Sequence, residues 1–130
     1  MQKGQALSAL AALANDQRLD LVRMLMPLGD EGLSAGDIAR RLGLSASRLS
    51  FHLSQMEQAG LIRSRKQARN VIYSVDAEGI GRTIGYLLND CCRGDAKVRA
   101  CCRQETAGPT HDRDQAEVLA ETVRASAAES

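Results

Sequence analysis

Apolar residues along the first ninety positions recur at spacings of three and four, which predicts a series of short helices interrupted by one hairpin. Residues Asp16–Leu28 carry apolar side chains on two faces, so this helix is expected to be buried over much of its circumference, with Pro27 weakening its last turn. The stretch Ala6–Ala14 is rich in Ala and Leu, which predicts an earlier amphipathic helix rather than a secretory signal. The expected apolar face of that helix holds Leu7, Leu10, Leu13 and Ala14.

Two further helices separated by a short turn follow in the sequence. Ser34 begins a capping-box pattern that predicts a helix ending at Gly43. Ser45 is a favourable N-cap for the next helix, which we place at Ala46–Gly60. Its inward-facing residues are Leu49, Leu53 and Met56. This pattern is typical of a helix-turn-helix, in which the second helix enters the major groove of DNA.

A β-hairpin is predicted directly after that helix. Leu61–Lys66 and Val71–Val75 have the composition of strands, and a polar tip of four residues separates them. The predicted fold class is therefore mainly α with a small β-hairpin, a winged helix-turn-helix. At 130 residues, one such domain is expected at 1–92, and residues 93–130 are expected to form a cysteine-bearing C-terminal segment and tail. In that tail, 104–110 is predicted to be a linker and 112–125 an isolated helix.

The net charge of +1 conceals an uneven distribution. Between Arg40 and Val75 there are seven basic residues and one acid, whereas ten acids and seven basic residues lie from Asp76 onward. A basic centre in a helix-turn-helix context predicts a surface for double-stranded DNA. The residues expected to contact DNA are Ser47, Arg48, Ser50, Phe51 and His52 on the recognition helix, and Arg65, Lys66 and Arg69 on the wing. Two alternatives stay open, namely that Phe51 packs under the wing and that His52 caps a neighbouring group.

The four cysteines form two adjacent pairs, Cys91-Cys92 and Cys101-Cys102. Neighbouring Cα atoms lie about 3.8 Å apart, closer than a relaxed disulfide requires, so neither pair is expected to be an internal bridge. Their concentration in one segment argues against a secreted disulfide scaffold and favours a thiol or metal site in the cytoplasm. Thiolates are soft ligands and therefore select thiophilic ions.

Several motifs resemble the ArsR (ArsR/SmtB) family of metal-responsive winged-helix repressors, over roughly residues 5–92. The motifs lie at Ala12–Leu19, Ile38–Ser45, Leu49–Leu53 and Ala59–Ile62. The resemblance implies a cytoplasmic homodimer, dimeric through its terminal helices, that leaves operator DNA when a metal or metalloid binds. No apolar stretch is long enough to span a membrane, so no membrane partner is expected, and no enzymatic activity is expected.

Two inducer sites that are usual in this family have no counterpart here. Residues 33–38 contain no thiol, and His52 and His111 are the only histidines, which disfavours a zinc, nickel or cobalt sensor. The segment Leu87–Cys92 instead resembles a branch of arsenic sensors that uses a vicinal pair and one later cysteine. By this resemblance the inducer is arsenite, or antimonite, and the ligands are drawn from Cys91, Cys92, Cys101 and Cys102, although the spacing to the later pair is longer than in that branch.

A continuous helix from residue 91 to 102 would place Cys91 and Cys101 about 15 Å apart, too far for one ion. A break at Gly94-Asp95 is therefore expected, and which of Cys101 and Cys102 supplies the third sulfur stays open. Other classes of protein are weaker alternatives. A redox-sensing repressor would oxidise the same thiols, a structural zinc site has unfavourable spacing, and an enzyme lacks a constellation around one nucleophile.

Overall fold

The computed structural model describes residues 1–107, and the helix expected at 112–125 lies outside them. The chain divides into two units, Met1–Cys91 and Cys92–Ser130. The first unit contains the helices α1 (Lys3–Leu13), α2 (Asp16–Leu25), η1 (Met26–Glu31), α3 (Ala35–Leu42), α4 (Ala46–Gln58), α5 (Ala77–Gly85) and η2 (Tyr86–Cys91), and the strands β1 (Leu33–Ser34), β2 (Ile62–Gln67) and β3 (Asn70–Val75). The second contains α6 (Ala96–Ala107). No helix among the described residues is long and apolar enough to cross a membrane.

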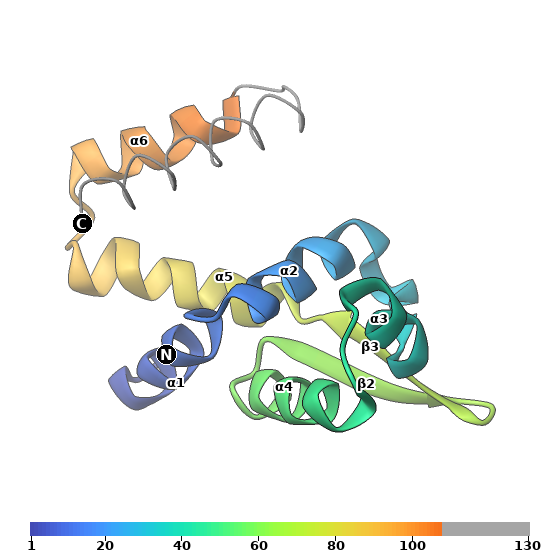
Figure 1. The fold of residues 1–130 in the computed structure, drawn as a ribbon. Coiled ribbons are helices and arrows are strands. Elements are labelled where there is room, and N and C mark those ends of the chain that lie inside the picture. The colour runs from blue at the N-terminus through green and yellow to red at the C-terminus, as the bar shows by residue number, and fades with distance from the viewer. Residues whose placement is uncertain (108–130) are drawn as a thin grey trace, which may run out of the picture. The chain divides into compact units, whose positions relative to one another are not determined.

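The sheet has three antiparallel strands in the order β1-β3-β2. β2 and β3 pair from Ile62 opposite Val75 to Gln67 opposite Asn70, and they extend together as the wing (Figure 1). β1 adds a short pairing of Leu33 with Tyr73. The sequence predicted the hairpin but not β1, because a strand of two residues has no periodicity that could reveal it.

Side-chain caps begin the helices where the sequence predicted them. The hydroxyl oxygens of Ser34 and Ser45 accept backbone N–H groups of Asp37 and Arg48, at 3.2 and 3.3 Å. The recognition helix α4 ends at Gln58, and Gly60 follows with a φ of 76°, a left-handed conformation that suits glycine. The helix-turn-helix of α3 and α4 is therefore confirmed.

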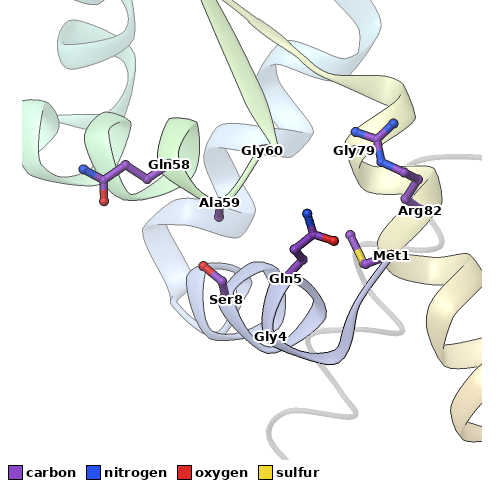
Figure 2. Close-up of a pocket in the computed structure, with 9 residues that line it drawn as sticks. All are labelled: Met1, Gly4, Gln5, Ser8, Gln58, Ala59, Gly60, Gly79 and Arg82. Atoms are coloured by element: carbon purple, nitrogen blue, oxygen red, sulfur yellow. The ribbon is translucent and has the colours of Figure 1, made fainter.

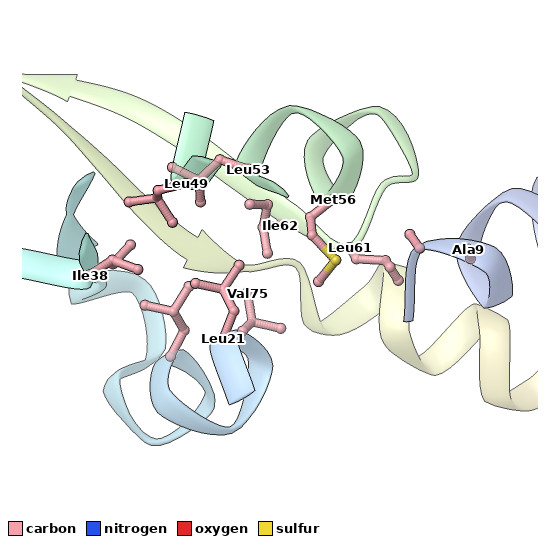
Figure 3. Packing of buried hydrophobic residues seen from close by; sticks show 11 residues of the cluster. Ala9, Leu21, Ile38, Leu49, Leu53, Met56, Leu61, Ile62 and Val75 are labelled. Atoms are coloured by element: carbon pink, nitrogen blue, oxygen red, sulfur yellow. The ribbon is translucent and has the colours of Figure 1, made fainter. Parts of the chain in front are cut away.

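The hydrophobic core lies between α2, α3, α4 and the sheet. Leu49, Leu53 and Met56 point inward from α4 as predicted, and they pack with Leu21 and Ile38 (Figure 3). The prediction of which face of α1 is buried was wrong. Its buried residues are Ala6, Ala9 and Ala12, whereas Leu7 is 57% exposed. Small side chains allow α1 to lie close to its neighbours, and this leaves a leucine on the surface.

The beginning of α5 lies directly against the end of the recognition helix. The Asp76 N–H donates to the carbonyl oxygen of Leu61 at 2.9 Å, and the Asp76 carboxylate caps α5 by accepting the Gly79 N–H at 3.1 Å. Gly79 is buried, and a Cβ at this position would overlap the carbonyl oxygen of Gly60. The two helices therefore approach through backbone atoms and not through flexible side chains.

The chain leaves α5 through a π-helical segment, η2, and then turns at the predicted break. Arg93 and Gly94 have φ values of 51° and 70°, and the Asp95 N–H donates to the Cys92 carbonyl at 2.9 Å. The Asp95 carboxylate then caps α6 through the N–H groups of Lys97 and Val98, at 2.9 and 3.1 Å. The prediction that a linker begins at residue 104 was wrong, because α6 continues to Ala107; the remainder of that linker lies outside the described residues.

Candidate nucleic-acid interface and thiol site

The outward face of α4 carries most of the residues predicted to contact DNA. Ser47, Arg48, Ser50 and Phe51 are all exposed. Phe51 retains 57% of its surface, so the alternative in which it packs under the wing is wrong. An exposed phenylalanine beside an arginine is suited to contact a thymine methyl group while the arginine binds guanine.

His52 is held from the side by the first turn of α2. Arg18 donates its Nε–H to His52 Nδ1 at 3.1 Å, and His52 Nε2 lies 2.9 Å from Gln17 Oε1. Because Nδ1 accepts the hydrogen bond from Arg18, the neutral ring carries its proton on Nε2, and this N–H donates a hydrogen bond to Gln17 Oε1. Burial lowers the pKa of His52 below 6.5, and the positive charges of Arg18 and Arg48 lower it further. In the free protein, both ring nitrogens are therefore engaged with α2, which agrees with the alternative that His52 caps neighbouring groups.

We expect an NMR titration to place the pKa of His52 below 6.5, and the Arg18→Gln substitution to raise that pKa by removing a neighbouring charge. Because folding lowers this pKa, the unfolded chain binds the proton more readily. The contribution of His52 to stability is therefore complete above about pH 6.5 and is lost as the pH falls through the folded-state pKa. A pKa of 6.5 or above in the folded protein would contradict the geometry.

The wing residues predicted to contact DNA differ in their surroundings. Lys66 and Arg69 are exposed near the tip of the β2–β3 hairpin. Arg65 instead donates from Nη2 to the carbonyl oxygens of Asp30 and Glu31, at 3.0 and 3.2 Å. These two hydrogen bonds link the wing to the end of η1, the segment before β1. Sequence periodicity could not reveal this role, because the partners are backbone atoms 34 and 35 positions away.

Replacing Arg65 by alanine should therefore lower the free energy of unfolding by about 1 kcal/mol, as two charge-assisted hydrogen bonds at an exposed site are lost. Lys66→Ala is the matched control, because it removes the same charge from the neighbouring position. We expect it to leave urea denaturation unchanged and to weaken only DNA binding. Equal stability of the two variants would contradict a structural role for Arg65.

All four cysteines are free thiols. Cys91 ends η2, Cys92 follows it, and Cys101 and Cys102 are exposed on α6. Within residues 1–107, no three His, Cys, Asp or Glu side chains are grouped closely enough to hold a metal ion.

A surface hollow of about 370 Å³ lies where α1, the end of α4 and the beginning of α5 meet. Gln5, Ser8, Gln58 and Arg82 are among its lining residues (Figure 2). Arg82 also lies 3.7 Å from Glu78 in an exposed ion pair. Sequence patterns gave no sign of this hollow.

An exposed polar and basic helix α4, its supporting helix α3 and a basic wing define a winged-helix DNA-binding protein. Comparisons with known proteins agree. A family model described as a helix-turn-helix domain matches residues 13–65. The HTH-type transcriptional regulator YgaV of Escherichia coli K12 is 40% identical over 88 residues, which is 68% of this chain and 87% of YgaV.

Two further relatives extend the comparison. The transcriptional activator HlyU of Vibrio cholerae is 35% identical to this chain, over 70% of this chain and 82% of the HlyU sequence. The structure of reduced HlyU matches with a TM-score of 0.52 and covers 68% of this chain and 88% of the HlyU chain. The homodimeric winged helix-turn-helix domain of Mb0332 from Mycobacterium bovis is 21% identical with a TM-score of 0.56, over 83% of this chain and 89% of that one, and shows the fold alone. The chain belongs to the ArsR family of helix-turn-helix transcriptional regulators.

Proposed function

We propose that this protein is a homodimeric repressor that binds operator DNA and is released when trivalent arsenic, or antimony, is bound by C-terminal thiolates. The ligands are Cys91, Cys92 and one of Cys101 and Cys102. The observation that carries this proposal is the position of the thiols. All cysteines of the chain are free and lie at or beyond the end of η2, directly after a winged-helix unit. A reducing cytoplasm would keep them in this state.

The exposed face of α4 supports the DNA-binding part of the proposal. Its side chains are polar, aromatic or basic, and the segment from Arg40 to Val75 has a net charge of +6. Such a surface attracts the phosphate backbone before any base is read. Lys66 and Arg69 are exposed on the wing, which supports phosphate contacts beside the major groove.

The terminal helices support the homodimer. Leu7 on α1 and Ile84 on α5 are large apolar side chains that are 57% and 47% exposed. Apolar residues at such positions are stabilised when a second copy covers them. The Mb0332 domain, which shares the fold, is homodimeric. Two recognition helices would then meet successive major grooves about 34 Å apart.

Metalloid binding is coupled to DNA through α5. Cys91 ends η2, and Cys92 directly precedes the turn at Arg93-Gly94, so metalloid binding would act on the chain at the end of α5 and η2. A change at the end of α5 reaches the recognition helix through the contact of Gly79 with Gly60. The spacing of the two recognition helices then departs from that of the grooves, and operator affinity falls.

A thiol count tests the inducer site. Reduced protein is titrated with arsenite, and the cysteines that still react with a chromogenic disulfide are counted. We expect four reactive thiols per subunit before arsenite and one after it, because three sulfurs bind each ion. Zinc is the control and should protect fewer thiols. Four reactive thiols at saturating arsenite would contradict the proposal.

A second candidate function is thiol redox sensing in the same fold. The observation that favours it is that all four cysteines are free and three of them are exposed, as oxidation requires. HlyU, a relative, has been described in a reduced form. In this case peroxide would join one cysteine of the first pair to one of the second, and DNA release would occur without metalloid.

A further inference from the structure

Arg18 is an arginine outside the helix-turn-helix whose side chain is fixed against the recognition helix. Its Nε–H donates to His52, and its Nη1 donates to the Ala12 carbonyl at 3.4 Å. The guanidinium carbon lies 5.6 Å from the centre of the Phe51 ring. Among the side chains that the structure describes, residues 1–103, no carboxylate forms an ion pair with Arg18. The structure therefore holds a positive charge in one orientation without neutralising it.

The neighbours of Arg18 explain this orientation. The His52 ring is itself fixed by Gln17 at 2.9 Å and makes an edge contact with Phe51, with ring centroids 5.9 Å apart. A neutral imidazole offers one acceptor, and Arg18 occupies it through Nε–H alone. One N–H of Nη1 donates to Ala12. The remaining N–H groups of the guanidinium are available to a ligand with acceptor oxygens.

The position of Arg18 beside α4 indicates which ligand that is. A helix with its side chains is about 10–12 Å across, and it fills a major groove about 12 Å wide. Side chains at the flank of the recognition helix therefore face the phosphates that border the groove. Phe51 is exposed on α4, and Arg18 lies over its ring. Arg18 is therefore next to the surface of α4 that would face the groove.

We propose that Arg18 binds a phosphate group of the operator backbone, and that His52 and Phe51 are the side chains that position it. This inference rests on the proposed DNA-binding function and adds α2 to the interface. It assigns His52 a positioning role in place of the predicted contact with DNA. Arg18 then contributes affinity for any duplex and adds little to the choice of sequence.

The salt dependence of DNA binding tests this role. Fluorescence anisotropy is measured with two labelled duplexes of equal length, one from the promoter of the protein's own gene and one of random sequence. Arg18→Gln should weaken binding to both by about tenfold or more, as a charge-assisted contact is lost. The slope of log affinity against log salt should become shallower by about 0.9 for each lost phosphate contact, hence about 1.8 for a dimer.

Arg23→Gln is the matched control, because Arg23 is exposed on the same helix and lies about 140° around it from Arg18. It removes the same charge and should leave the slope unchanged. A slope in Arg18→Gln equal to that of the control would overturn the inference. Failure of the unaltered protein to prefer its promoter duplex would instead refute the proposed function, so the two failures are distinct.

A second variant keeps the test decisive if Arg18→Gln does not fold. Arg18→Lys retains the charge, and the introduced amine can be acetylated. We expect the promoter duplex to protect this amine from acetic anhydride at least about fivefold, as phosphate contact excludes the reagent. Equal acetylation with and without the duplex would overturn the inference.

Discussion

Replacement of Cys91 by serine is expected to abolish release from operator DNA by arsenite while changing operator affinity by no more than about twofold, as for an exposed position away from the DNA-binding face. In the unaltered protein, arsenite should lower operator affinity by about 5- to 150-fold, the usual range of coupling between two sites. A serine hydroxyl has nearly the shape of the thiol but is a poor ligand for a thiophilic ion. The measurement is anisotropy of promoter DNA with and without arsenite.

Single substitutions of the later pair provide the control. Only one cysteine of this pair supplies the third sulfur, so we expect one of Cys101→Ser and Cys102→Ser to lose induction and the other to retain it. The variant that loses induction then identifies the third ligand. Loss of both DNA binding and induction in Cys91→Ser would contradict the separation of the two sites, and retained induction would exclude Cys91 as a ligand.

Alanine at position 79 should destabilise the protein by about 3 kcal/mol, at the upper end of what overpacking usually costs. The added Cβ would overlap the carbonyl oxygen of Gly60, which is backbone and cannot move aside as a side chain can. Urea denaturation at fixed protein concentration measures this loss, since dimerisation makes stability dependent on concentration. Operator affinity should fall as well, because the same contact positions α4 against α5.

Gly81→Ala is the matched control two residues further along α5. A Cβ at Gly81 would meet no atom within 4 Å, so the exchange should stabilise the helix by about 0.5–1 kcal/mol through helix propensity. Opposite signs for the two substitutions are the expected result. Equal changes in the free energy of unfolding for the two variants would show that the contact between α5 and the end of α4 does not restrict the side chain at position 79.

The sequence was sufficient to predict the helix-turn-helix and the wing because their signals are local. Ser34 and Ser45 cap helices with their own neighbours, and Leu49, Leu53 and Met56 recur at helical spacing. The break after Cys92 was also foreseen from Gly94. In each case, residues within a few positions determine the outcome.

The features that sequence reasoning missed depend on contacts between distant segments. The buried face of α1 is alanine because its neighbours leave little space, and an isolated helix would favour its leucines. Arg65 binds carbonyl groups more than thirty positions away, and Arg18 binds a histidine at the same kind of separation. Charge and periodicity identify such arginines as exposed, whereas their partners are set by the tertiary fold.

The central claim is that a thiophilic metalloid releases this regulator from DNA. Its most direct test is fluorescence anisotropy of a labelled duplex from the promoter of the protein's own gene, first saturated with protein and then challenged separately with arsenite, antimonite, zinc and peroxide. Reducing conditions are kept except for peroxide. We predict release by arsenite or antimonite and not by zinc or peroxide. Release by peroxide alone would contradict metalloid sensing and favour the redox function, and failure to bind the duplex would contradict operator recognition at this promoter.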